Sequence, residues 1–185
     1  MSPGAAKRRD GGKLRRLVVR FAKDRRGNTA LEFAFIAIPF LAVIFAVFQT
    51  AMVYVSGSMM QTAVTDVARL VRTGQAKAMT AADFRNAICS RITVTFNCQS
   101  MLLVDVKSYS SFASAPAPSV PVVGGQIDTT TFGTNFNLGT GGSVVVLRTA
   151  ISYPLVLPMI GTSMANLNGN KMLIMASAAF KNEAF

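Results

Sequence analysis

Glu32 is the acidic residue whose position in this 185-residue chain points most directly to chemistry. It stands at the start of an apolar run, and no further charged residue follows until Asp66. A charge held against hydrocarbon costs up to about 3 kcal/mol near the centre of a bilayer and less near its edge. The default hypothesis for such a residue is therefore that it has a function. Pairing with a cation would offset much of that cost. The plainer alternative is that Glu32 only favours the positive end of a helix, a stabilisation of about 0.3–1 kcal/mol.

The sequence contains few residues that could form a metal site or an activated nucleophile. It contains two cysteines, Cys89 and Cys98, and no histidine. This leaves too few ligands for a zinc site and excludes a Ser-His-Asp or Cys-His nucleophile. The glycine-rich segment 139–142 lacks the lysine and hydroxyl residue of a phosphate-binding loop and is better interpreted as a turn. We therefore predict no enzymatic activity, no metal and no cofactor.

Basic residues are concentrated at the N-terminus. The first 27 positions hold ten basic and two acidic residues, hence a formal charge of +8, whereas the remaining 158 positions hold nine basic and six acidic, hence +3. A basic block beside a long apolar run is typical of the cytoplasmic flank of a membrane helix. Nucleic-acid binding requires a basic face on a folded domain, and none is visible, so we predict no nucleic-acid partner.

The apolar run from Phe33 to Val55 predicts a transmembrane helix. It has about the 20 residues needed to cross a bilayer, and it lacks the small-residue cleavage site of a removable signal peptide. Pro39 lies seven residues into the run, where it removes a helix hydrogen bond and predicts a kink or a locally loosened turn. With the basic block inside, everything after the run lies outside the cytoplasm. A disulfide between Cys89 and Cys98 is then the default.

Beyond the span the helix continues as an amphipathic rod. Its apolar stripe consists of residues spaced four, three and four apart: Met60, Val64, Val67 and Val71. This spacing predicts a helix from Thr29 to Thr73, with Gly74 as a plausible stop. Half of the helix would lie in lipid, and half would pack on a soluble domain.

The rest of the chain predicts a small α+β domain. Thr80 and Asp83 have the spacing of a capping box, followed by apolar residues on one face of a short helix at Phe84, Ile88 and Ile92. Alternating apolar and polar residues predict strands at 101–108, 143–154 and 171–181. We expect a half-solvated antiparallel sheet, with Lys107 and Arg148 as solvated charges on its polar face. Residues 114–142, rich in Pro, Gly, Thr and Ser, predict a long loop with room for a short strand or helical turn.

Residues 25–33 (RRGNTALEF) resemble the processing site of type IV prepilins. In that family a membrane peptidase cuts after the glycine and leaves a glutamate as the fifth mature residue. The resemblance implies that Gly27 ends a leader and that Asn28 is the mature N-terminus. It also implies a role for Glu32 in assembly, because the new α-amine of Asn28 is mostly protonated at neutral pH. Glu32 could pair with its own N-terminus or with that of a neighbouring subunit.

Residues 32–40 (EFAFIAIPF) resemble the start of the TadE-like proteins, pseudopilins of the tight-adherence (Tad) pilus machinery. Residues 68–75, the cysteine pair and residues 178–183 are also similar to that family. Two positions depart from related patterns. Asn28 replaces the Phe of many type IV pilins, and Phe33, which the resemblance assigns to assembly, stands where short Tad major pilins usually have Tyr. Neither departure removes the glycine or the glutamate.

Together these features predict a type IV pilin-like α+β protein in three parts. Residues 1–27 form a basic cytoplasmic leader, residues 28–79 a long helix with a transmembrane segment at about 33–55, and residues 80–185 a periplasmic domain. The predicted location is the inner membrane, as a single-pass protein with its N-terminus inside. Incorporation into an extracellular pilus stays open.

The predicted function is that of a minor pilin or pseudopilin in Tad pilus assembly and adherence. A mature part of 158 residues is much longer than a Tad major pilin. The implied partners are a prepilin peptidase, other Tad pilins or pseudopilins, the inner-membrane assembly platform and the lipid bilayer. The alternative is an uncleaved single-pass membrane protein whose periplasmic domain is a scaffold or binding module for another envelope component.

Overall fold

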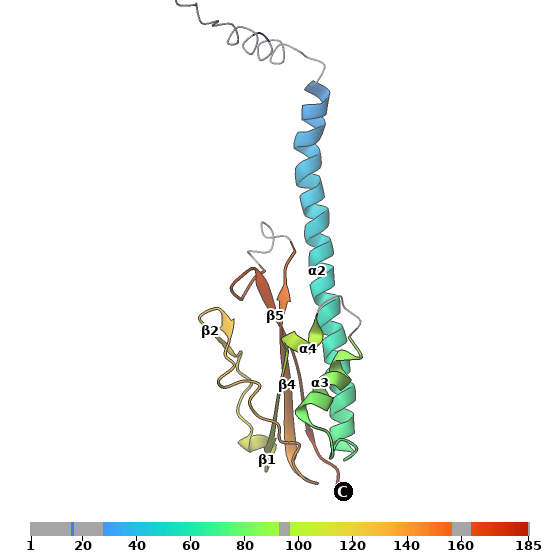
Figure 1. The fold of residues 1–185 in the computed structure, drawn as a ribbon, viewed down its shortest axis with the longest axis vertical. Coiled ribbons are helices and arrows are strands. Elements are labelled where there is room, and N and C mark those ends of the chain that lie inside the picture. Colours follow the sequence, from blue (N-terminus) through green and yellow to red (C-terminus); the bar gives the residue numbers. More distant parts are fainter. Residues whose placement is uncertain (1–15, 17–27, 93–96, 157–163, 185) are drawn as a thin grey trace, which may run out of the picture. The chain divides into compact units, whose positions relative to one another are not determined.

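The computed structural model describes residue 16 and residues 28–92, 97–156 and 164–184 (Figure 1). The leader predicted at residues 1–27 therefore lies outside the described residues, apart from Arg16. The elements follow in the order α2 (Asn28–Arg72), α3 (Ala81–Cys89), α4 (Cys98–Met101), β1 (Leu102–Tyr109), the 3-10 helix η2 (Phe112–Ser114), β2 (Val122–Val123), β3 (Gln126–Ile127), β4 (Val144–Pro154) and β5 (Lys171–Lys181). The predicted α+β class, with a long helix before a small antiparallel sheet, is confirmed. The contacts divide the chain into two compact units, residues 1–43 and 44–185.

The long helix α2 runs for 45 residues and continues through Pro39. The kink predicted at that proline stays a prediction. The helix ends as the sequence indicates, because Gly74 takes a φ of 78° and its N–H donates to the carbonyl of Val71 at 3.0 Å. A left-handed conformation costs glycine little and stops the helical hydrogen-bond pattern. Arg69 and Arg72 lie in the last turn, where cations favour the negative end of the helix.

The main sheet has the order β1-β4-β5, and both pairs are antiparallel. The observed strands begin and end within one residue of the predicted ones. The register places Asp105 of β1 opposite Arg148 of β4. On the outer edge of β1, the N–H of Val106 donates to the carbonyl of Asn135 at 2.9 Å, and the N–H of Asn137 donates to the carbonyl of Val106 at 2.9 Å. A short stretch of the loop thus covers part of this edge.

One face of the sheet packs against the second half of α2. The predicted stripe on the helix is buried, since Met60, Val64, Val67 and Val71 are at most 3% exposed. These side chains share one cluster with alternate residues of the strands, among them Val104, Val106, Val145, Leu147 and Ile151. Full burial of a single Val or Leu side chain is worth roughly 1.5–3 kcal/mol, so this cluster is the main source of stability in residues 44–185.

The short helix α3 closes one side of this core. Thr80 is its N-cap: the hydroxyl accepts from the N–H of Asp83 at 3.2 Å, and the Asp83 carboxylate accepts from the N–H of Thr80 at 2.9 Å. The capping box predicted from the sequence is confirmed. Phe84 is fully buried and meets Phe136 edge to face, with ring centres 5.6 Å apart.

The opposite face of the sheet differs from the expectation of a solvated surface. Phe132, Ala150, Leu167 and Leu173 form a second buried cluster there, with further apolar residues of the loop and of β2 and β3 packed around it. The loop predicted at 114–142 supplies much of this cover. Val122, Ile127 and Phe132 pack on this face because burial removes their apolar surface from water. The composition of the surrounding segment, rich in Pro, Gly, Thr and Ser, indicates a solvated loop and conceals these three residues.

Candidate functional site

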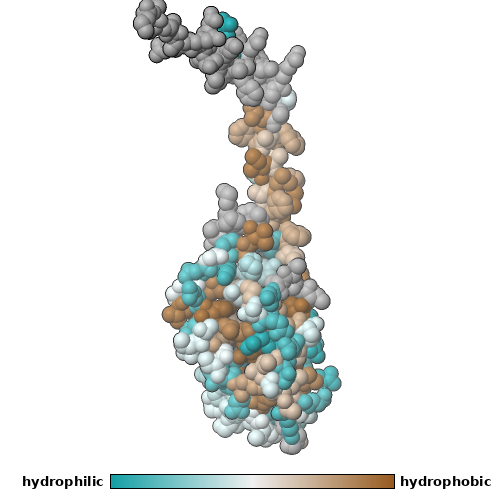
Figure 2. Space-filling view, in the orientation of Figure 1, coloured by the Kyte–Doolittle hydropathy of each residue, from teal (hydrophilic) through white to brown (hydrophobic). Residues whose placement is uncertain are grey.

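The first part of α2 exposes apolar side chains on all sides. Phe33, Phe35 and Ile36 are each more than 70% exposed, and Tyr54 is 77% exposed further along. The other large exposed apolar residues on the helix are Leu31, Ile38, Phe40, Leu41, Val43, Ile44, Phe45, Val47, Phe48 and Val55. Figure 2 shows the first part of this helix as a largely brown, hydrophobic surface. Water-soluble monomers rarely expose contiguous apolar patches larger than a few hundred Å², and such surfaces mark contacts with membranes or other proteins.

By length and composition, α2 is long and apolar enough to cross a membrane, and its most apolar window has no buried part. A helix that is apolar all round and unburied fits a single-pass membrane anchor. No residue between 31 and 48 is buried, and burial begins at Gln49, which is 6% exposed. The span predicted at 33–55 therefore overlaps with the part of α2 that joins the core, since Gln49 and Val53 are both buried.

The overlap leaves residues 31–48 as the part of α2 that has no buried residue. Residues 31–48 alone would cover about 27 Å at 1.5 Å per residue, close to the roughly 30 Å of a hydrocarbon core. Residues 49–55 follow directly, with Val53 buried in the core and Tyr54 exposed. Tyrosine is enriched at membrane–water interfaces, because its ring is apolar and its hydroxyl polar.

Glu32 lies in the first part of α2 and is exposed. Asn28 is the first residue of the helix. The helical spacing of four places positions 28 and 32 one turn apart on the same side. Phe33 follows with 73% of its surface exposed. Gly27, the predicted last residue of the leader, lies outside the described residues. The structure thus places Glu32 and Phe33, the residues predicted to act in assembly, at exposed positions on one helix.

Cys89 and Cys98 form a disulfide with their Cα atoms 5.7 Å apart. The bond joins the end of α3 to the start of α4, across residues 93–96, which lie outside the described part of the chain. In the described ranges no group of three or more His, Cys, Asp or Glu residues lies close enough together to hold a metal ion.

Sequence analysis missed a cluster of charged side chains on the sheet face away from α2. From the sequence, Lys107 and Arg148 were expected to be solvated charges on the polar face of the sheet. The structure buries the Asp105 side chain to 3% exposure and places the Lys107 ammonium 3.4 Å from its carboxylate. Strand alternation does place residues 105 and 107 on one face. The position of Arg148 beside them depends on the register of β1 and β4, which the sequence alone does not specify.

The fold and this surface fit an α+β protein with a single-pass membrane anchor, in which the same long helix also contributes to the core. The family model described as TadE-like protein matches residues 27–69, which begin at the predicted processing site and include most of α2. The resemblance stated from the sequence is confirmed over these residues, and this segment of the chain is similar to the TadE-like family. The comparisons with curated proteins and with solved structures gave no match.

Proposed function

We propose that this chain is a minor pilin or pseudopilin of a Tad pilus, matured by a prepilin peptidase and active in pilus assembly and adherence. The observation that carries the proposal is the exposed apolar helix with Glu32 near its start, inside the segment that matches the TadE-like family. A structural role of this kind needs no catalytic residues. It needs an anchor, a surface for neighbouring helices and a folded domain.

The proposed pathway starts at the membrane. The basic leader would stay in the cytoplasm and orient α2 with its N-terminus inside. A peptidase at the inner face would then cut between Gly27 and Asn28. Cleavage removes a segment of formal charge +8 and leaves a single α-amine at the start of the helix. The disulfide-bonded domain would lie in the periplasm, where such bonds persist.

Assembly would use the apolar surface of α2 against helices of other pilins and against the inner-membrane platform. Helix association in lipid depends on close packing and on polar contacts between helices. The α-amine of Asn28 and the carboxylate of Glu32, from the same or a neighbouring subunit, would form such a contact. Pairing offsets much of the cost of holding either charge near hydrocarbon.

The proposal is tested by complementation of a strain that lacks this gene but retains the Tad machinery. Wild-type protein should restore the number of pili seen by electron microscopy and should co-purify with other pilins from detergent extracts. Gly27→Val should remain full-length and fail to restore pili, because a small residue is needed beside the scissile bond. Gly12→Val, the same change elsewhere in the leader, is the matched control and should behave as wild type.

Two outcomes would contradict the proposal. Unchanged piliation in the deletion strain would remove the pilin role. Full complementation by uncleaved Gly27→Val protein would favour the alternative, an uncleaved single-pass scaffold for another envelope component.

A further inference from the structure

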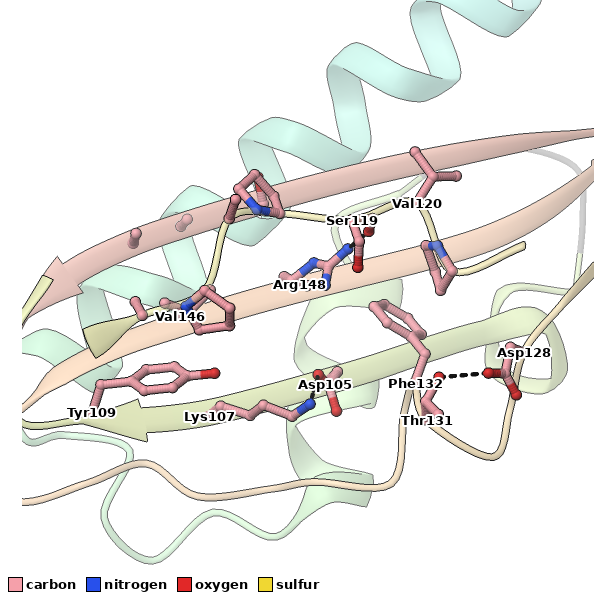
Figure 3. Close-up of a pocket in the computed structure, with 18 of the residues that line it drawn as sticks. Asp105, Lys107, Tyr109, Ser119, Val120, Asp128, Thr131, Phe132, Val146 and Arg148 are labelled. Carbon is pink, nitrogen blue, oxygen red and sulfur yellow. Dashed lines mark hydrogen bonds and ion pairs between the residues drawn. The ribbon is translucent and has the colours of Figure 1, made fainter. Parts of the chain in front are cut away.

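A cavity of about 620 Å³ lies on the sheet face opposite α2, in the part of the chain formed by residues 44–185 (Figure 3). Its floor consists of residues from all three strands, including Lys107 of β1, Arg148 of β4 and Ser177 of β5. The proline-rich segment 115–121 crosses over it, and residues 128–132 form another wall. This volume lies within the range of pockets that hold small molecules or a few residues of peptide.

The two carboxylates that line the cavity already have partners. Asp105 accepts from the backbone N–H of Asn135 at 3.3 Å and from its side-chain amide at 3.2 Å, and it lies 3.4 Å from Lys107. Asp128 accepts from the hydroxyls of Thr130 and Thr131 and from the N–H of Thr130 at 3.0 Å. These hydrogen bonds hold the pKa of Asp128 below its usual range, so it stays ionised and its oxygens stay occupied.

Arg148 is different, because its partners carry no negative charge. Although the register sets it opposite Asp105, no carboxylate of the described residues lies within ion-pair distance of its guanidinium. The guanidinium lies 5.2 Å from the ring centre of Phe132, and one nitrogen donates to the carbonyl of Ser119. A guanidinium has five N–H donors in a planar fork that fits a carboxylate. Among the described residues no carboxylate neutralises this charge, so it is available to pair with the carboxylate of a ligand.

The remaining walls are largely apolar. The lining includes the aromatic residues Tyr109 and Phe112, together with Val146, Ala178 and several prolines. Phe112 is 58% exposed, so a ligand that covered it would remove apolar surface from water. A free carboxylate ion would engage Arg148 but would leave these walls bare. An acidic side chain on a short stretch of polypeptide would use both.

We propose that this cavity binds an acidic peptide segment of another protein, with a Glu or Asp carboxylate held by Arg148 and the flanking residues packed on Tyr109 and Phe112. This inference goes beyond the proposed pilin function and does not rest on it, because it concerns a part of the chain outside the segment that matches the TadE-like family. A membrane-anchored subunit with such a site would recognise a partner through its folded domain as well as through α2.

The test uses full-length protein in detergent micelles and two fluorescent, end-capped peptides, Ala-Val-Glu-Val-Ala and its Gln counterpart. Fluorescence polarisation should show at least about tenfold tighter binding of the Glu peptide, the difference expected for one charge-assisted hydrogen-bonded pair. Arg148→Gln should abolish this preference, and Arg148→Lys should retain only part of it. Arg91→Gln is the matched control, because Arg91 pairs with Asp66 away from the cavity and its loss should change nothing.

Phe112→Ala provides a second variant at an exposed position, and it should weaken both peptides by a similar factor. Equal binding of the Glu and Gln peptides to wild-type protein, or no binding of either, would overturn the proposal whatever the variants do. Retention of the preference in folded Arg148→Gln protein would overturn the role of Arg148. Displacement of the peptide by sodium acetate at equal concentration would show that the site takes small carboxylates and not a peptide.

Discussion

At the scale of single residues, Glu32 carries the most specific functional proposal. It is exposed on α2, one turn from the position that would become the N-terminus, among side chains that are apolar. Its contribution to folding of the domain should be small, because it lies in the unit of residues 1–43, outside the buried core of residues 44–185. We therefore propose that its charge serves assembly.

Replacing Glu32 by Ala should leave membrane insertion and cleavage nearly intact but reduce pilus formation and co-purification with other pilins. Glu183→Ala, which removes another exposed carboxylate, is the control and should not alter piliation. The measurement is the count of pili per cell at matched protein level. Normal piliation by the Glu32→Ala variant would show that the proposed charge pair is dispensable.

The cap of α3 gives a prediction on stability. Thr80→Ala removes the hydroxyl that accepts from Asp83 and should lower the free energy of unfolding by about 1 kcal/mol, the usual value for an N-cap. Urea unfolding of the full chain in mild detergent would measure it. An unchanged unfolding midpoint would show that the capping box contributes nothing.

The partner of this cap, Asp83, predicts a pH dependence. Hydrogen bonds from the side chain and the backbone of Thr80 lower the pKa of Asp83. A carboxyl group with a lowered pKa in the folded state stabilises above its unfolded pKa of about 3.9, and this stabilisation is lost as the pH falls through the folded value. Asp83→Ala should therefore be less stable than wild type at pH 6, and the difference should shrink below pH 4. A difference that persists undiminished at pH 2.5 would contradict this account.

At the scale of elements, the disulfide links α3 to α4 where the intervening backbone is short. Closing a loop of nine positions is worth on the order of 2.5–3 kcal/mol in the chain-entropy model. In protein taken from the cell envelope, a thiol reagent should label neither cysteine until a reductant is added. Full labelling of both Cys89 and Cys98 in native, unreduced preparations would contradict a periplasmic disulfide.

The end of β5 is tied to the loop before β4 by Asn182, which is 4% exposed. Its side-chain amide donates to the carbonyls of Leu138 at 2.9 Å and Thr140 at 3.2 Å. Asn182→Ala would leave these carbonyls without their donor and should cost roughly 1–3 kcal/mol. Glu183→Ala is the matched neighbour: it breaks an exposed ion pair with Arg72 and should cost at most about 1 kcal/mol. Equal losses in thermal unfolding would contradict this ranking.

The elements themselves could be predicted from local patterns, and their arrangement could not. The stripe at Met60 to Val71, the Thr80 cap and the alternation in the strands are each properties of a few neighbouring residues, and all three are confirmed. The strand register that sets Asp105 opposite Arg148 joins residues 43 positions apart in the sequence. Likewise, Phe132 gives no local sign that it packs over the sheet, because burial of a loop residue is decided by the surface beneath it.

At the scale of the whole molecule, the chain separates its tasks along the sequence. The basic block precedes an apolar helix, and the remaining 158 residues carry a charge of only +3. The second half of the same helix supplies the core stripe of the domain. The proposed anchor and the core stripe are thus successive parts of one helix, α2. A substitution of an apolar residue between 31 and 48 should therefore affect the membrane contact and leave the buried core unchanged.

The most direct test of the proposed pilin function is the N-terminus of the protein in its own membranes. Intact mass and N-terminal sequencing of detergent-extracted protein should show a chain that begins at Asn28 in cells with the prepilin peptidase and at the original N-terminus in cells without it. Detection of only the full-length chain in cells that make the peptidase would contradict the account.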